Sequence, residues 1–254
     1  MTFTVEGFDV LLLILVRVST FVFVAPFFSL PNVPFRVKAG FSFIFALIIF
    51  QVSGTNIQYS TVIEYAILIM KEALTGLIIG FFTNVSYYIL NFAGQLMDME
   101  IGFSMANEFD PITRIESTIT SNLYSYSVIL MLLVTDMHLY ILKAFADTFQ
   151  IIPLGEAHIK SNMYLLMVDF IKNYFIIGFR IVLPVFAAML IVNTILAILA
   201  KIAPQMNMFV IGFQLKIFTG LLILFLLVKF LPTVSGFIFN QMADMMKAAV
   251  RVLE

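Results

Sequence analysis

The sequence predicts a membrane protein with several hydrophobic segments that are read as helices, on the basis of three observations. Of the 254 residues, 62% are hydrophobic, and the mean hydropathy is +1.06. Only 11% are charged, whereas a soluble domain carries roughly 25% charged and about 45–50% apolar residues. The apolar residues collect in six stretches, and about 20 apolar residues are enough to span a bilayer. A soluble enzyme is excluded, because the polar surface that a soluble globule needs is missing.

The first two stretches cover about residues 8–30 and 39–50. Pro26, Pro31 and Pro34 lie at the end of the first stretch. Proline lacks an N–H and clashes with the preceding turn, so each of these residues is expected to end or kink a helix. The second stretch is too short to span a bilayer comfortably.

The charges around the first stretch predict its orientation. Glu6 and Asp9 come first, whereas Arg36 and Lys38 follow the apolar run. Because basic residues concentrate on the cytoplasmic side of a membrane, the N-terminus is expected to face away from the cytoplasm. A cleavable signal peptide is not expected, because such a peptide begins with a basic region.

The third stretch, about 62–93, and the fifth, about 163–200, are longer than a bilayer requires. As single helices they would measure roughly 48 Å and 57 Å, whereas the hydrocarbon core is about 30 Å thick. Tilt absorbs only part of this excess. These segments therefore either bend back as hairpins or rise out of the lipid into other protein. Pro184 lies inside the fifth stretch and is expected to kink or end its helix.

The fourth stretch, about 123–149, carries Asp136 and His138 near its middle. It is either one continuous span or two half-helices that meet there. The sixth stretch, about 208–231, is separated from the fifth by Pro204. Residues 241–254 space their apolar side chains as one face of a helix, which predicts a short amphipathic helix.

Residues 94–122 form the only long polar interval before the tail. Five of the fifteen acidic residues fall within it: Asp98, Glu100, Glu108, Asp110 and Glu116. Asp110 is a natural N-cap and Pro111 a natural first helical residue, so a helix is expected to restart there. The interval is either a surface connector or a re-entrant segment that lines or blocks a pore.

Several ionisable residues lie inside apolar stretches, where an unpaired charge in lipid costs at least about 2.5–3.5 kcal/mol. They are Arg17, Lys71, Glu72, Asp169, Lys172, Arg180, Lys216 and Lys229. They either mark a polar pathway or a contact between subunits, or they reach the interface or nearby carbonyls with their long side chains. Asp169 and Lys172, three residues apart, could neutralise each other. Gly76 and Gly80 form a small-residue pair that favours close helix packing.

Other functional classes find no support in the sequence. A formal net charge of −1 without a basic stripe argues against nucleic-acid binding. The chain has no cysteine, and neither His138 nor His158 belongs to a metal-binding motif. No phosphate-binding P-loop is present. We therefore expect no catalytic residue, no metal site and no cofactor, and we expect the energy for any transport to come from partner proteins.

Three motifs nevertheless resemble the motifs of one protein family, and they occur in the same order along the chain. The first contains Gly94, Gln95, Gly102, Phe103, Asp110 and Pro111. The second contains Lys201, Pro204, Gln205, Asn207 and Phe209, followed by Gly212. The third is the N-terminal pattern of Arg17, Pro26 and Pro34. Together they resemble the FliR family of flagellar biosynthetic proteins, whose counterparts in injectisomes are called SctT or SpaR.

The resemblance implies a single all-α domain over residues 1–254, built of kinked helical hairpins. Members join FliP-type and FliQ-type subunits in a helical hetero-oligomeric export gate, which works with FlhB-type and FlhA-type export proteins. This gate belongs to the flagellar basal body in the bacterial inner membrane and projects partly toward the periplasm. Unfolded export substrates pass through it.

The resemblance also implies a plug. In the family, a loop after the Gly-Gln motif closes the channel, and it corresponds to about residues 102–116 here. The plug residues would be Gly102, Phe103, Met105, Glu108, Phe109, Asp110 and Pro111. Met105 and Glu108 take the place of aromatic plug residues, and apolar and methionine side chains would exclude ions.

Three alternatives remain open at this point. An injectisome subunit would share the same motifs. A secondary transporter would use broken helices near Asp136 and Pro184, but it predicts internal repeats, and none is evident. An intramembrane protease has little support, because its candidate acids, Asp98 and Asp110, lie in a polar interval.

Overall fold

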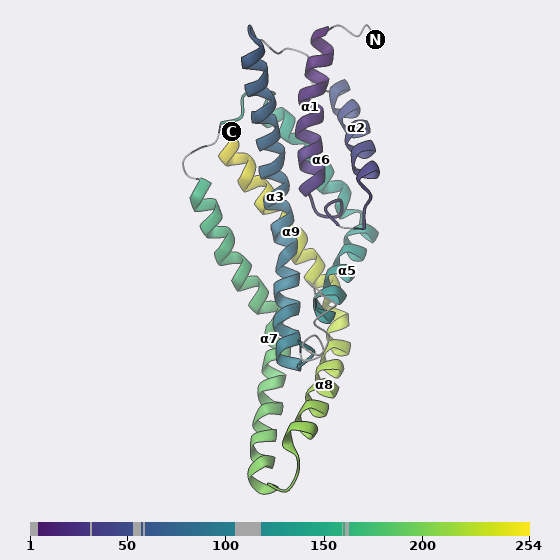
Figure 1. Ribbon diagram of the computed structural model, residues 1–254, viewed down its shortest axis with the longest axis vertical. Helices are drawn as coiled ribbons and strands as arrows, with labels where there is room; N and C mark the ends of the chain where they lie inside the picture. The colour runs from purple at the N-terminus through teal and green to yellow at the C-terminus, as the bar shows by residue number, and fades with distance from the viewer. Residues whose placement is uncertain are drawn as a thin grey trace. The chain divides into compact units, whose positions relative to one another are not determined.

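The computed structural model describes residues 5–30, 32–52, 57, 59–104, 118–158, 160 and 163–254. Within these residues the only regular secondary structure is helical, so the predicted all-α class is confirmed (Figure 1). The helices are α1 (Val5–Val24), α2 (Phe35–Val52), α3 (Val62–Ile101), α5 (Ile119–Val134), α6 (Met137–Ile151), α7 (Met163–Ile202), α8 (Met208–Leu227), the 3-10 helix η1 (Val228–Phe230) and α9 (Leu231–Leu253).

The chain packs as two compact units, each made of segments distant in sequence. The first unit contains Met1–Tyr87, Asp136–Phe170 and Ile238–Glu254. The second contains Tyr88–Thr135 and Ile171–Phe237. The helices α3, α7 and α9 therefore each contribute residues to both units.

Five helical segments of the described chain are long and apolar enough to cross a membrane. They are α1, α2, α3, α7 and the stretch formed by α8 to α9; a sixth results if α5 and α6 count together as one broken span. The break between α5 and α6 lies at Asp136, whose φ of 56° is left-handed, a conformation that aspartate adopts more readily than most residues. Of the two readings of the fourth stretch, the structure shows two helices.

The two longest helices do not bend back on themselves. Both α3 and α7 run for 40 residues, or about 60 Å at the rise of an α-helix, so the expectation that these stretches form hairpins within themselves is wrong. Pro184 lies inside α7 without ending it. A proline in a helix removes one backbone hydrogen bond, and membrane helices tolerate this loss where neighbouring helices or local adjustments of the backbone satisfy the freed group.

Helices α2 and α3 also extend beyond their apolar stretches. The carbonyl of Pro34 accepts hydrogen bonds from the N–H groups of Val37 and Lys38, at 3.0 Å and 3.3 Å, and α2 begins at the next residue, Phe35. Helix α3 runs eight residues into the expected polar loop over 94–122, because Met97 and Ile101 continue its buried face. Gly102, with a φ of 98°, follows its last residue.

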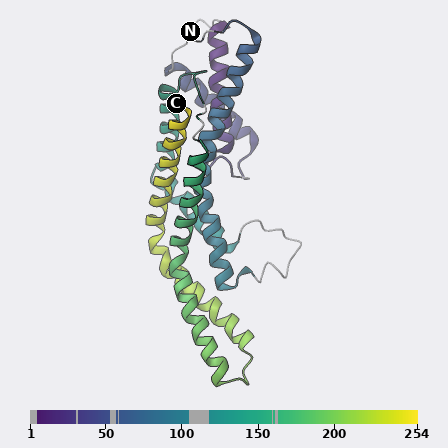
Figure 2. The ribbon, with the colours of Figure 1, turned by 90° about the vertical axis from the view of Figure 1, so that its left-hand side faces the viewer.

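Helical hairpins do form between consecutive helices (Figures 1 and 2). In the first unit, α1 packs beside α2. In the second unit, α7 and α8 are joined by a tight turn that contains Pro204 and Gln205. The last helix, α9, is amphipathic in its C-terminal half: Met242, Met245, Met246, Ala249 and Val250 are buried, whereas Asp244, Lys247 and Arg251 are exposed.

Candidate functional site

A buried ion pair joins α1 to α3 in the first unit. The side chains of Arg17 and Glu72 are both inaccessible to solvent. The guanidinium makes two contacts with the carboxylate, an ion pair from Nε to Oε2 and a hydrogen bond of 3.0 Å from Nη2 to Oε1. Two parallel N–H donors to one carboxylate are the strongest geometry for such a pair. The charges that the sequence places in two apolar stretches thus satisfy each other.

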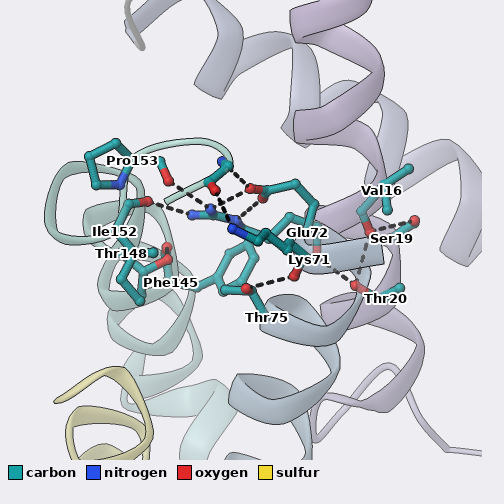
Figure 3. Close-up of polar contacts among 12 residues, drawn as sticks. Val16, Ser19, Thr20, Lys71, Glu72, Thr75, Phe145, Thr148, Ile152 and Pro153 are labelled. Carbon is teal, nitrogen blue, oxygen red and sulfur yellow. Dashed lines mark hydrogen bonds and ion pairs between the residues drawn. The ribbon is translucent and has the colours of Figure 1, made fainter. Parts of the chain in front are cut away.

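The same pair holds the turn that follows α6 (Figure 3). Arg17 Nη1 donates to the carbonyl of Ile152 at 2.9 Å, and the Glu72 carboxylate accepts from the N–H of Gly155 at 2.7 Å. Lys71 Nζ donates to the carbonyl of Gly155 at 3.1 Å. A cation at the C-terminal end of α6 satisfies free carbonyls and complements the helix dipole. Three distant parts of the sequence are therefore fixed at one point.

Two glycines allow α1 and α3 to approach closely enough for this contact. A Cβ atom at Gly76 would lie 2.2 Å from the carbonyl oxygen of Arg17 and 2.2 Å from Thr20 Oγ1. At Gly80 it would lie 3.1 Å from the carbonyl oxygen of Phe21. The small-residue pair is thus the face on which α3 packs against α1, and the prediction of close packing is confirmed.

A second polar cluster joins α3 to α5 in the second unit. Asp98 is inaccessible to solvent, and its carboxylate accepts hydrogen bonds from the backbone N–H of Thr120, at 2.9 Å, and from the Thr120 hydroxyl. About two turns earlier on α3, Asn91 Oδ1 accepts from the hydroxyls of Ser121 and Ser125, at 2.6 Å and 3.1 Å. We call these residues the α3–α5 clamp.

Gly94 lies between the two halves of the clamp. A Cβ atom there would lie 2.2 Å from Ser121 Cα and 2.4 Å from its backbone nitrogen. Only a glycine permits this approach of the two backbones. The clamp therefore fixes the end of α3 and the start of α5, which border residues 105–117.

The expected plug lies largely on that bordered segment. Gly102 and Phe103 follow α3, and a Cβ at Gly102 would lie 3.6 Å from the ring of Phe213 on α8. Met105, Glu108, Phe109, Asp110 and Pro111 lie outside the described residues. Their assignment as plug residues stays a prediction.

The second motif forms the exposed end of the α7–α8 hairpin. Lys201 lies in the last turn of α7, where a cation complements the helix dipole. Pro204 and Gln205 lie in the turn and are exposed. Asn207 is the N-cap of α8, and Phe209 beyond it is 71% exposed. Each of these roles is therefore confined to the turn and the helix ends that adjoin it.

Replacing Asn207 with alanine should destabilise the start of α8. The Asn207 side chain accepts hydrogen bonds from the N–H groups of Phe209 and Val210, at 3.2 Å and 3.4 Å. Loss of such an N-cap costs about 1 kcal/mol. Hydrogen exchange of the first-turn amides of α8 should become several-fold faster, and Asn207→Asp, which keeps the acceptor, should restore the slow exchange. Equal exchange in both variants would contradict the role of the cap.

Of the remaining charges that the sequence singles out, Lys216 is half-buried and the others are exposed. Asp169, Lys172 and Arg180 on α7 all have exposed side chains, and none forms an ion pair within the described chain. The described residues contain no ion pair between Asp169 and Lys172, although the two lie three residues apart on α7.

Sequence reasoning missed the clamp and the partner of Arg17. Glu72 is recognisable as an intramembrane charge, but nothing local indicates that it pairs with a residue 55 positions earlier. Asp98 and Asn91 carry a weak signal: they lie seven residues apart, on the same face of a helix. The polar character of residues 94–122 obscured it, because the start of this interval was expected to be a connector or a re-entrant segment and not the end of a helix.

Comparisons with known proteins cover almost the whole chain. The model of the family described as bacterial export proteins, family 1, matches residues 8–242. The flagellar biosynthetic protein FliR of Bacillus subtilis is 30% identical over 247 residues, which cover 96% of this chain and 95% of that protein. The proteins of the same name from Aquifex aeolicus and Escherichia coli are 28% and 27% identical, over 240 and 238 residues. These matches cover 93% and 91% of this chain and 91% and 90% of those proteins.

Proposed function

The chain belongs to the family of bacterial export proteins, family 1, and on this premise we propose that it is a non-enzymatic subunit of the flagellar export apparatus. The relatives reported above are all named flagellar biosynthetic proteins. That agreement favours the flagellar assignment over the injectisome alternative. In the finer form of the proposal, the chain forms part of the inner-membrane channel for unfolded flagellar proteins.

The observation that carries the proposal is the length of the exposed apolar helices. Large apolar side chains are exposed along α7 from Tyr164 to Ile202, a distance of roughly 57 Å. Even at a tilt of about 40°, the upper end of the usual range, this surface would extend roughly 44 Å along the membrane normal. A hydrocarbon core of about 30 Å cannot cover it. Other protein must cover the rest.

The proposed partners are those that the resemblance to the FliR family implies. In the proposed gate the covering surfaces are supplied by FliP-type and FliQ-type subunits, beside FlhB-type and FlhA-type export proteins. The assembly lies in the inner membrane at the flagellar basal body and extends toward the periplasm. An apolar helix that continues beyond the lipid is what such a raised assembly requires.

The proposed plug is the segment of about residues 102–116. Its support is the α3–α5 clamp. Asp98 lies before this segment and Thr120 after it, and the two residues are joined by hydrogen bonds. A segment whose two ends are fixed to rigid helices spans a defined gap. It can therefore close a channel repeatedly at the same place.

Deleting Met105–Glu108 should make the assembled gate leak ions without preventing its assembly. The shortened segment can no longer fill the channel, whereas the clamp that joins α3 to α5 is untouched. The measurement is potassium efflux from liposomes that contain the purified assembly. A several-fold increase over the unaltered assembly is expected, with the same partner subunits recovered.

A variant of unaltered length distinguishes the loss of the sealing side chains from the shortening of the segment. In it, residues 105–108 are replaced with Gly-Ser-Gly-Ser, which keeps the distance between helix ends but removes the apolar side chains. It should also leak, because sealing depends on those side chains. An unchanged ion barrier in both variants would exclude the plug assignment.

A further inference from the structure

An open pocket lies in the second unit between α5, α7 and the junction of α8 with α9. Its volume is about 490 Å³. The lining residues used below are Tyr124, Arg180, Pro184, Phe230, Thr233 and Phe237, and we call this feature the Arg180 pocket. Arg180 is the only charged residue in the lining, and most of the others are apolar.

Arg180 has no carboxylate partner in the described chain. Its side chain is exposed, and it forms no ion pair within the residues that the structure places. An unpaired arginine at the centre of a bilayer is unfavourable. This contrasts with Arg17, the other arginine in a long apolar stretch, whose charge is fully paired. The charge on Arg180 therefore calls for an anionic group from outside the described residues.

The position of Arg180 on α7 indicates where that group comes from. Arg180 is the eighteenth of 40 residues, so it lies roughly 26 Å from one end of the helix and 33 Å from the other. If α7 is centred in the bilayer, a lipid headgroup is about 15 Å away from Arg180 along the normal. If α7 rises out of the bilayer, its apolar surface beyond the headgroups is covered by protein. The helix geometry favours a protein anion over a lipid phosphate.

We propose that the Arg180 pocket receives an apolar helix of a neighbouring gate subunit, and that an Asp or Glu side chain of that helix pairs with Arg180. The inference rests on the proposed function, since it states how the chain joins its neighbours. The guanidinium offers two parallel donors to a carboxylate. The hydroxyl groups of Tyr124 and Thr233 in the lining can donate further hydrogen bonds. Phe230, Phe237 and Pro184 supply the apolar walls for the rest of the helix.

The first test measures assembly. The assembly is isolated by a tag on this chain from cells that produce the complete export apparatus, and the partner subunits recovered per copy of the chain are counted. Arg180→Met, which keeps most of the side-chain length, should lower this recovery about tenfold, because the partner carboxylate is left buried and unpaired. Arg180→Lys, which keeps the charge, should recover most of it. The matched control is Lys172→Met, an exposed cation two turns earlier on α7 that does not line the pocket.

The second test identifies the occupant directly. A photo-crosslinking phenylalanine analogue replaces Phe230, and the crosslinked peptide is sequenced by mass spectrometry. The expected product is a peptide from an apolar helix of another subunit that contains Asp or Glu. Changing that acid to its amide should reproduce the Arg180→Met defect, and Arg180→Asp combined with the acid changed to lysine should restore assembly.

The outcomes separate this inference from the proposed function. Crosslinks to lipid alone, a peptide without an acidic residue, or normal assembly of Arg180→Met would each overturn the carboxylate partner while leaving the export-gate role standing. If the unaltered chain recovers no gate subunits, the proposed function itself fails. Should Arg180→Met not accumulate in the membrane, the crosslink and the charge swap still decide the matter, because both use chains that carry a charge at position 180.

Discussion

Replacing Arg17 with alanine should remove most of the protein from the membrane and abolish swimming. The variant leaves the carboxylate of Glu72 buried without its cation, and breaking one side of a buried ion pair costs about 3–5 kcal/mol. A typical domain has only about 5–15 kcal/mol of stability in total. Because a loss of about 1–2 kcal/mol already changes abundance several-fold, we expect the steady-state level in isolated membranes to fall roughly tenfold or more on immunoblots.

Two further variants test whether the loss of the ion pair causes the fall in the protein level. Arg36→Ala removes an exposed arginine at the start of α2 and should leave the level unchanged. The double variant Arg17→Met, Glu72→Leu removes both charges, and apolar replacements of a buried pair are often tolerated. It should accumulate better than either single variant, although the carbonyl of Ile152 and the N–H of Gly155 lose their partners. If the level of the double variant falls by as much as the two single losses combined, the paired-charge explanation is contradicted.

Gly94→Ala should lower the temperature at which the purified assembly dissociates in detergent, whereas Gly40→Ala should not. The added methyl at position 94 would lie 2.2 Å from a backbone atom of Ser121. That atom cannot move away without displacing α5. Overpacking of this kind costs about 1–3 kcal/mol, and we expect the upper part of that range because the obstruction is main chain.

Gly40 is the matched control, since it also lies inside a helix. A Cβ at Gly40 would meet nothing within 4 Å. A glycine-to-alanine change in an open helical position is stabilising by roughly 0.5–1 kcal/mol. The two substitutions are chemically identical and should have opposite signs. If both substitutions raise the dissociation temperature, α3 and α5 do not approach each other closely at Gly94 and Ser121.

Local features of the sequence predicted several of the helix ends. Pro26 follows the end of α1, and Pro34 precedes the start of α2. Asp136 and His138 drew attention to the place where α5 gives way to α6. Each of these signals acts through the backbone of neighbouring residues, so it can be recognised without knowledge of the fold.

Long-range pairing could not be predicted in this way. Whether Arg17 meets Glu72 depends on how α1 and α3 are rotated and shifted against each other, and that register is set by Gly76 and Gly80 together with the rest of the packed face. The expected loop over 94–122 began too early for a related reason. Asp98 looks like a loop residue by its polarity, but a hydrogen-bonded carboxylate can be buried on a helix.

The two-unit arrangement also bears on how the protein is made. The first unit draws its core from three separate parts of the chain, and the last part is α9, whose Met242, Ala249 and Leu253 are almost completely buried. The backbone N–H groups of His158 and Lys160 donate to the carbonyls of Leu253 and Val252. During synthesis on the ribosome, helices α1 to α3 are therefore made long before the residues that complete their unit. The core of the first unit can be completed only after residue 253 has been added.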